Sequence, residues 1–203
     1  MNWFYDWNHE SNFTRDFVKR TLSFWVDEYH VDGYRWDFTQ GLSQTPNGNG
    51  SYDQSRINIL NDYGNHMWSQ DPGVYMILEH WCDMAEEAAL AENGFMFWSN
   101  ATHDYQEAAM GYPSNLNWAN YQAHNMSEPR VVSYAESHDE ERLMYKNLEY
   151  GANSGDYNVT DLATSLARME AIQCFNIPLP GPKMIWQFGE LGYDYSINTC
   201  SDG

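Results

Sequence analysis

Stretches with helical periodicity alternate with short apolar segments along this chain. Residues 31–36, 74–78, 95–98, 130–135 and 183–187 have the composition of strands, and residues 13–29, 52–69, 84–91 and 161–175 have helical spacing. The alternation predicts an α/β fold with a parallel sheet. A doubly wound sheet and part of a (β/α)8 barrel both fit, because a complete barrel takes about 250 residues and this chain has 203.

Two of the expected helices have an apolar face. The inward face of residues 13–29 is predicted to comprise Phe17, Leu22, Trp25, Val26 and Tyr29, and that of residues 52–69 to comprise Ile57, Ile59, Leu60, Tyr63 and Met67. Residues 45–51 and 151–157 are rich in Gly, Asn and Ser and are predicted to be loops. Residues 101–128 predict short helices at best.

The charge of the chain narrows its partners. It has 29 acidic and 10 basic residues, for a net charge of −19. Such a surface repels phosphate backbones and anionic lipid headgroups, so we expect no nucleic acid and no membrane as partners. Aromatic residues make up 16% of the chain, which fits stacking on sugar rings, although most of them are expected in the core.

The cysteines and the first residues give little information about metal binding, disulfides or secretion. Cys82, Cys174 and Cys200 are too few and too scattered for a disulfide framework or a zinc site. Residues 1–10 have neither the basic nor the apolar region of a signal peptide.

Three acidic residues follow predicted strands: Asp37, Glu79 and Asp139. The carboxyl ends of parallel barrel strands converge on the face that carries active sites, so we expect the three to meet in one cleft. Carboxylates there suit glycoside hydrolysis, in which one is a nucleophile and another a general acid.

The neighbours of these acids agree with such roles. Arg35 lies two residues before Asp37, so both side chains share one face of the strand, and the cation is expected to lower the pKa of Asp37. Glu79 ends an apolar segment that is expected to raise its pKa. Taken singly, the three motifs also fit a plain ion pair, an exposed loop glutamate and a charged loop. Their order on successive strand ends favours one site.

Three segments resemble the signature regions of glycoside hydrolase family 13, the α-amylase family. Residues 33–37 (GYRWD), 77–81 (ILEHW) and 136–142 (ESHDEER) are similar to its strand-four, strand-five and strand-seven regions. The similarity covers nearly the whole chain, notably to secreted bacterial α-amylases of the Bacteroidetes type. It implies that residues 1–203 are the C-terminal part of a catalytic (β/α)8 TIM barrel, about strands 4 to 8, without strands 1 to 3 and the C-terminal β-domain.

The resemblance implies a role for each matched residue. Asp37 is the nucleophile, Glu79 the general acid and then base, and Asp139 stabilises the transition state through substrate hydroxyls. Arg35 supports Asp37, and His138 hydrogen-bonds the sugar. The family retains anomeric configuration, so the two working carboxylates should lie ~5–5.5 Å apart.

Aromatic residues near the motifs divide into two groups. Trp81, Tyr34 and Trp186 are candidates for stacking on sugar, with Trp81 the preferred one. Trp36 lies between Arg35 and Asp37 and is expected to face the core.

One departure from the family concerns calcium. Many members have Lys-His three and four residues after the nucleophile, where the His carbonyl binds calcium. Gln40 and Gly41 stand at these positions. No metal ligand is therefore assigned, and calcium stays open for the full-length enzyme.

The activity implied by the resemblance is retaining hydrolysis of α-1,4-glucosidic bonds in starch- or glycogen-type α-glucans. A branching enzyme or glucanotransferase, and a non-catalytic carbohydrate-binding fragment, are the alternatives. Alone, the chain is expected to be inactive, because a partial barrel leaves sheet edges open. A secreted or periplasmic location is implied by the resemblance only.

Overall fold

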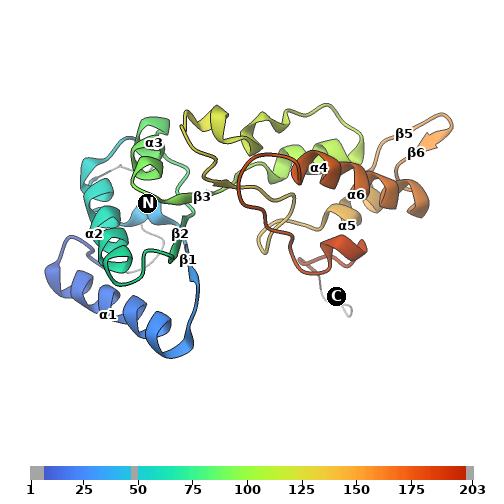
Figure 1. Ribbon diagram of the computed structural model, residues 1–203. Coiled ribbons are helices and arrows are strands. Elements are labelled where there is room, and N and C mark those ends of the chain that lie inside the picture. Colours follow the sequence, from blue (N-terminus) through green and yellow to red (C-terminus); the bar gives the residue numbers. More distant parts are fainter. Residues whose placement is uncertain (1–6, 47–49, 200–203) are drawn as a thin grey trace. The chain divides into compact units, whose positions relative to one another are not determined.

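The computed structural model describes residues 7–46 and 50–199 (Figure 1). The chain divides into two compact units. The first comprises Met1–Trp98 and His124–Arg130, and the second comprises Ser99–Ala123 and Val131–Gly203. Cys200 and positions 47–49 of the predicted loop lie outside the described residues.

The first unit is built on three parallel strands, β1 (Gly33–Trp36), β2 (Tyr75–Leu78) and β3 (Met96–Trp98). Helices α1 (Asn12–Tyr29), α2 (Gln54–Gln70) and α3 (Met84–Glu92) alternate with them, and a 3-10 turn, η1 (Thr39–Gly41), follows β1. The alternation and the parallel pairing confirm the predicted α/β class. All three strands were expected within one or two residues of their observed bounds.

Gly33 sets the fit between β1 and β2. A Cβ atom at this position would lie 2.4 Å from the carbonyl oxygen of Tyr75 and 2.6 Å from its Cβ atom. Only glycine allows the two backbones to approach so closely. The register that results pairs Arg35 with Ile77 and Trp36 with Leu78.

Helix α2 supplies much of the core of the first unit. Asp53 caps its start by accepting a hydrogen bond from the Ser55 N–H at 2.8 Å. The predicted inward face of α2 is confirmed, since its members are all buried: Ile57, Ile59, Leu60, Tyr63 and Met67.

The predicted inward face of α1 is largely wrong. Leu22 is buried, but three members of that face are exposed: Phe17, Trp25 and Tyr29. The helix instead turns its polar side toward α2, where Lys19 bonds Asp62 at 2.6 Å and Ser23 bonds His66 at 3.1 Å. These pairs fix the rotation of α1 and leave its aromatic residues on the surface of the described unit.

The second unit packs three helices together: α4 (Thr102–Met110), α5 (Leu143–Tyr150) and α6 (Leu162–Asn176). Its core includes Tyr105 on α4, Leu143 on α5 and Ile172 on α6. The remaining elements are strand β4 (Val131–Val132), the antiparallel pair β5 (Asn153–Ser154) and β6 (Tyr157–Asn158), and the turn η4 (Gly189–Leu191). Two further 3-10 turns, η2 (Leu116–Ala119) and η3 (Tyr121–His124), follow α4 in the chain.

Two expectations for this unit need correction, and one helix was missed. The loop predicted at residues 151–157 contains the β5–β6 hairpin, because Asn153 and Ser154 pair with Asn158 and Tyr157. The strand predicted at residues 183–187 is reduced to a single parallel bridge between Ser133 and Lys183. Helix α5 was not predicted. In the part of the chain that the structure describes, no helix has the length and apolar character to cross a membrane.

Candidate active site

Asp37 and Glu79 follow the neighbouring parallel strands β1 and β2, and Arg35 joins them. Arg35 Nη1 donates to Asp37 Oδ1 at 2.6 Å, and Arg35 Nη2 donates to Glu79 Oε2. The strand ends are themselves bonded, since the Glu79 N–H donates to the Trp36 carbonyl at 3.0 Å. One guanidinium therefore bridges the two carboxylates. The contact with Asp37 was predicted from the spacing, and the contact with Glu79 was not.

The two carboxylates differ in exposure. The Asp37 side chain is 80% exposed and the Glu79 side chain is 7% exposed. Glu79 was expected among apolar neighbours, but its closest partner is a cation. That cation also lies against an aromatic face, with the Arg35 guanidinium carbon 5.4 Å from the centroid of the Trp98 ring.

The candidate stacking residues of the first unit have distinct partners. Trp81 has a left-handed backbone conformation, with φ of 49°, and its Nε1 donates to the Trp98 carbonyl at 3.2 Å. Trp36 stacks on Tyr63 with ring centroids 5.3 Å apart, which confirms that it faces the core. The Tyr34 hydroxyl donates to the Leu22 carbonyl of α1. Tyr34 therefore lies on the same side of β1 as Trp36, opposite to Arg35.

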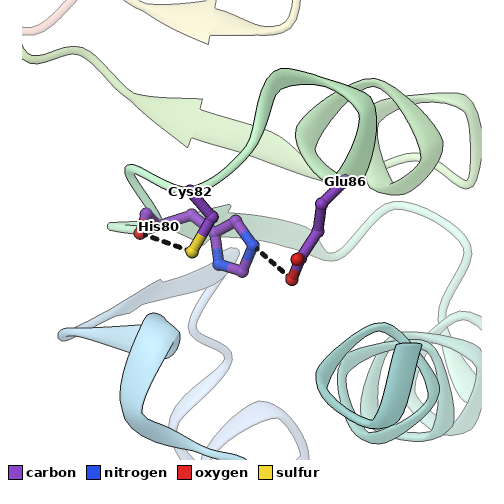
Figure 2. A group of neighbouring side chains, drawn as sticks. All are labelled: His80, Cys82 and Glu86. Atoms are coloured by element: carbon purple, nitrogen blue, oxygen red, sulfur yellow. Dashed lines mark hydrogen bonds and ion pairs between the residues drawn. The ribbon is translucent and has the colours of Figure 1, made fainter. Parts of the chain in front are cut away.

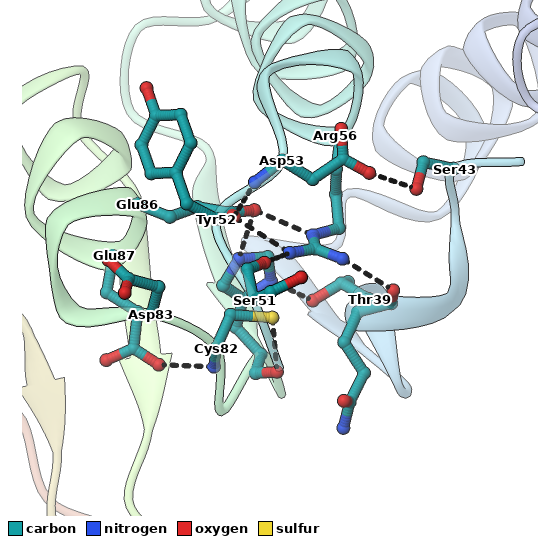
Figure 3. A network of polar contacts seen from close by, with 12 residues as sticks. Thr39, Ser43, Ser51, Tyr52, Asp53, Arg56, Cys82, Asp83, Glu86 and Glu87 are labelled. Carbon is teal, nitrogen blue, oxygen red and sulfur yellow. Dashed lines mark hydrogen bonds and ion pairs between the residues drawn. The ribbon is translucent and has the colours of Figure 1, made fainter. Parts of the chain in front are cut away.

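A buried polar network lies next to the strand ends, and it was not predicted from the sequence (Figure 3). Thr39 Oγ1 donates to the Glu79 carbonyl at 2.9 Å and is hydrogen-bonded to His80 Nδ1 at 2.8 Å. His80 Nε2 is bonded to Glu86 Oε1 at 3.0 Å, and Glu86 forms an ion pair with Arg56 at 2.7 Å. All four of these side chains are buried.

Helix geometry explains how the network is placed. Arg56 lies one turn before Leu60 on the inward face of α2, so the spacing could have marked it as buried. Asp83 caps α3 by accepting from the Ala85 N–H at 2.8 Å, and this start turns Glu86 inward.

His80, Cys82 and Glu86 form a group that could in principle hold a metal ion, since their ligand atoms lie within 4.8 Å of one another (Figure 2). Each is already engaged, however, and Cys82 Sγ lies 3.2 Å from the His80 carbonyl. Burial raises the pKa of the Cys82 thiol to about 12, whereas metals bind the thiolate. With the Arg56 cation also on Glu86, this donor set does not fit a metal ion.

The remaining predicted residues belong to the second unit. His138 Nε2 lies 3.3 Å from Asp139 Oδ2, and the His138 ring lies 5.9 Å from that of Trp186. The predicted contact of His138 with sugar hydroxyls stays a prediction. Because Asp139 lies in a different unit from Asp37 and Glu79, the meeting of the three carboxylates stays a prediction.

A buried ion pair organises the segment around Asp139. Arg142 Nη1 lies 3.4 Å from Glu136 Oε1, and the Leu143 N–H donates to Glu136 Oε2 at 2.8 Å. Burial raises the pKa of Glu136 against the opposing effects of these partners. Residues 136–142 therefore follow β4 as a turn closed on itself, with Asp139 at its exposed side.

The sequence is similar to those of known enzymes. No family model matches the chain. The chain is 26% identical over 139 residues to the 1,4-alpha-glucan branching enzyme GlgB of Bacillus caldolyticus, covering 66% of this chain and 19% of that enzyme. It is 24% identical over 206 residues to the 1,4-alpha-glucan branching enzyme GlgB of Thiobacillus denitrificans, covering 89% of this chain and 26% of that enzyme.

Solved structures agree with this likeness. Amy13B of Eubacterium rectale matches with a TM-score of 0.68 and 19% identity, over 95% of this chain and 36% of that one. An α-amylase of Anoxybacillus matches with a TM-score of 0.66 and 14% identity, over 92% of this chain and 38% of that one. Apo pullulanase of Klebsiella pneumoniae also has a TM-score of 0.66, with 14% identity over 93% of this chain and 26% of that one.

The chain has the fold of part of a (β/α)8 barrel. This confirms the predicted fold class and decides against the doubly wound sheet. The sequence relatives and the shared fold agree with the resemblance to the α-amylase family found in the sequence. The chain spans 19% to 28% of the length of the branching enzymes that it matches.

Proposed function

We propose that this chain is the part of an α-amylase-family enzyme that carries its catalytic carboxylates, and that the enzyme acts on α-1,4-linked glucans. The observation that carries the proposal is the bridge from Arg35 to Asp37 and Glu79 at two neighbouring strand ends. A shared cation brings an exposed and a buried carboxylate together, and two adjacent carboxyl groups are what a retaining glycosidase requires.

The proposed mechanism is a double displacement. Asp37 attacks the anomeric carbon while Glu79 donates a proton to the departing glycosidic oxygen. Glu79 then takes a proton from the incoming acceptor, which releases the sugar from Asp37. The exposure of Asp37 leaves its carboxylate open to substrate, and Arg35 Nη1 holds it in place through a 2.6 Å contact.

Asp139 and His138 are proposed to bind hydroxyl groups of the reacting sugar, and Trp81 to stack on substrate. Their support is the family resemblance together with the contact between His138 and Asp139. The secreted or periplasmic location, and the likeness to secreted bacterial α-amylases, rest on the resemblance alone.

A branching or transfer activity is the second candidate, because the sequence relatives named above are 1,4-alpha-glucan branching enzymes. Hydrolysis and transfer share the covalent intermediate and differ in the acceptor. Counting the reducing ends and the branch points formed from amylose distinguishes hydrolysis from branching. Branching adds branch points without a net gain of reducing ends.

The roles of Asp37 and Glu79 can be separated in the complete enzyme. Asp37→Asn should lower turnover of every glucoside by about 10³-fold or more, while glucan binding survives. Glu79→Gln should lower turnover of glucan by about 10²- to 10⁴-fold. An aryl glucoside with an acidic leaving group departs without a proton, so Glu79→Gln should still release the aryl group and form the glycosyl-enzyme, whereas Asp37→Asn should do neither.

Asp71→Asn is the matched control. Asp71 lies in the turn before β2, and its side chain accepts from the Gly73 N–H at 2.8 Å. Its turnover should match that of the unchanged enzyme. Full activity of Asp37→Asn would refute the assignment.

A further inference from the structure

Arg56 is a fully buried cation that collects oxygen atoms from three segments of the first unit (Figure 3). Its Nε and Nη2 donate to the two carboxylate oxygens of Glu86 at 2.7 and 2.8 Å. Its Nη1 donates to the Gln40 carbonyl at 2.9 Å, and Nη2 also donates to the Ser51 carbonyl at 2.6 Å. The guanidinium thus ties α2 to α3 and to both ends of the segment after β1.

The charges of this group are fixed by its contacts. Burial alone would raise the pKa of Glu86, but hydrogen bonds from His80, Arg56 and the Asp53 N–H lower it. Burial alone would also lower the pKa of Arg56, but the Glu86 carboxylate raises it. The pair is therefore an ionised carboxylate with a charged guanidinium, and both side chains are buried.

The acceptors of Arg56 are of the kind that a hard metal ion uses. Calcium binds six to eight oxygen atoms of carboxylates and main-chain carbonyls. In the α-amylase family a carbonyl four residues after the nucleophile is expected to bind calcium, which is the position of Gly41. The preceding carbonyl, that of Gln40, faces Arg56 instead. A calcium ion that used these oxygens would lie against a buried guanidinium, so the residues present do not fit it.

We propose that the Arg56 guanidinium replaces a bound metal ion. It holds together α2, α3 and the segment after β1, next to the strand ends that Asp37 and Glu79 follow. Glu86 is hydrogen-bonded to His80, and His80 is hydrogen-bonded to Thr39. Thr39 in turn donates to the Glu79 carbonyl, so Arg56 restrains the main chain of Glu79 through these contacts. Arg56 is a positioning residue. The inference about the cation rests on the contacts of Arg56, and its link to catalysis rests on the proposed function.

The thiol of Cys82 provides a local reporter. It is half-buried beside the network, and its raised pKa makes it slow to react until the segment opens. In the complete protein, Cys174→Ser and Cys200→Ser leave Cys82 as the measured thiol of this chain. Its rate of labelling by a disulfide reagent then reports opening of the first unit without any need for catalysis.

With Arg56 present, we expect a chelator or millimolar calcium to leave the rate of Cys82 labelling unchanged. Arg56→Ala leaves Glu86 buried without its partner, so labelling should become about 100-fold faster. Calcium should then slow labelling of Arg56→Ala, because an ion can occupy the vacated oxygens. Mere loss of packing would produce no such response to calcium. Arg56→Lys, which keeps the charge but not the forked geometry, should fall between.

Arg168→Ala is the matched control. Arg168 also donates to main-chain carbonyls, those of Ala108 and Ala109, but it belongs to the second unit. Its replacement should leave Cys82 labelling unchanged and insensitive to calcium.

Two outcomes would overturn the proposal. Faster labelling of the Arg56 protein after chelation would show that a bound metal ion holds the segment. An Arg56→Ala protein with slow labelling would show that the guanidinium does not. If Arg56→Ala fails to fold, the chelator arm and Arg56→Lys still decide. Because labelling needs no substrate, either result is independent of whether the enzyme acts on glucans.

Discussion

The Thr39 hydroxyl and the Thr39 N–H both donate to the main-chain carbonyl of Glu79, each at 2.9 Å. Thr39 comes two residues after Asp37, so the loop that carries the proposed nucleophile is bonded to the residue proposed as acid. The relative position of the two carboxylates is therefore fixed twice, by Arg35 on the side chains and by Thr39 on the main chain.

Thr39→Val keeps the shape of the side chain but removes its hydroxyl. Unfolding by urea should show a loss of about 1 to 2 kcal/mol, because the Glu79 carbonyl and His80 Nδ1 each lose a buried partner. The complete enzyme should lose kcat more than KM, since the carboxylates would be less well positioned. Thr39→Ser keeps the hydroxyl and should retain most of the stability and most of kcat. Equal kcat in Thr39→Val would argue against a positioning role.

Arg35→Lys tests the bridge between the carboxylates. A lysine ammonium is a single point and cannot reproduce a guanidinium that donates from two nitrogens to two acids. We expect kcat to fall by about 100-fold, as is typical for a small displacement of reacting groups. Steady-state kinetics on soluble glucan provide the measurement. Arg20→Lys is the control, since Arg20 donates to a carbonyl of its own helix at 3.4 Å.

Glu86→Gln should change how stability depends on pH. The pKa of Glu86 in the folded protein is lowered, so its ionised form stabilises the fold above the unfolded pKa of about 4.3. That contribution is lost as the pH falls through the lower folded-state pKa. The variant should be about 3 kcal/mol less stable at pH 7, because Arg56 loses its buried partner. Urea titrations should show this difference shrinking under acid conditions, and a constant difference would contradict the prediction.

Gly33→Ala should disturb the pairing of β1 with β2. Its Cβ atom would meet the Tyr75 carbonyl oxygen at 2.4 Å, and neither backbone can move without breaking the ladder. A loss of about 1 to 3 kcal/mol is expected in thermal or urea unfolding. Gly73→Ala is the comparison, because its Cβ would meet only the Asp71 side chain, at 3.1 Å. Equal stability of the two variants would count against the strand contact.

The strands of the first unit and the spacing of Arg35 and Asp37 could be predicted because they depend on local pattern. Apolar runs mark β1, β2 and β3, and the two-residue period of a strand places Arg35 with Asp37. The buried face of α2 followed from its helical period in the same way.

The rotation of α1 and the Arg56 network could not be predicted, because each depends on residues far apart in the sequence. The rotation of α1 is set by Lys19 with Asp62, and the Arg56 network joins segments 30 residues apart. Polar residues give no sign in the sequence of which distant partner will neutralise them. The helical period could mark Arg56 as buried on the inward face of α2, but it could not identify Glu86 of α3 as its partner.

The β5–β6 hairpin is a site where the chain should tolerate an insertion. Gly155 lies at its turn with no atom within 4 Å of the position a Cβ would take, and both Asn153 and Ser154 are exposed. Residues inserted there would extend a solvent-facing tip rather than displace packed side chains. A fluorescent tag or a small folded domain could therefore be grafted between Ser154 and Tyr157, with both ends of the graft already anchored by a strand pair.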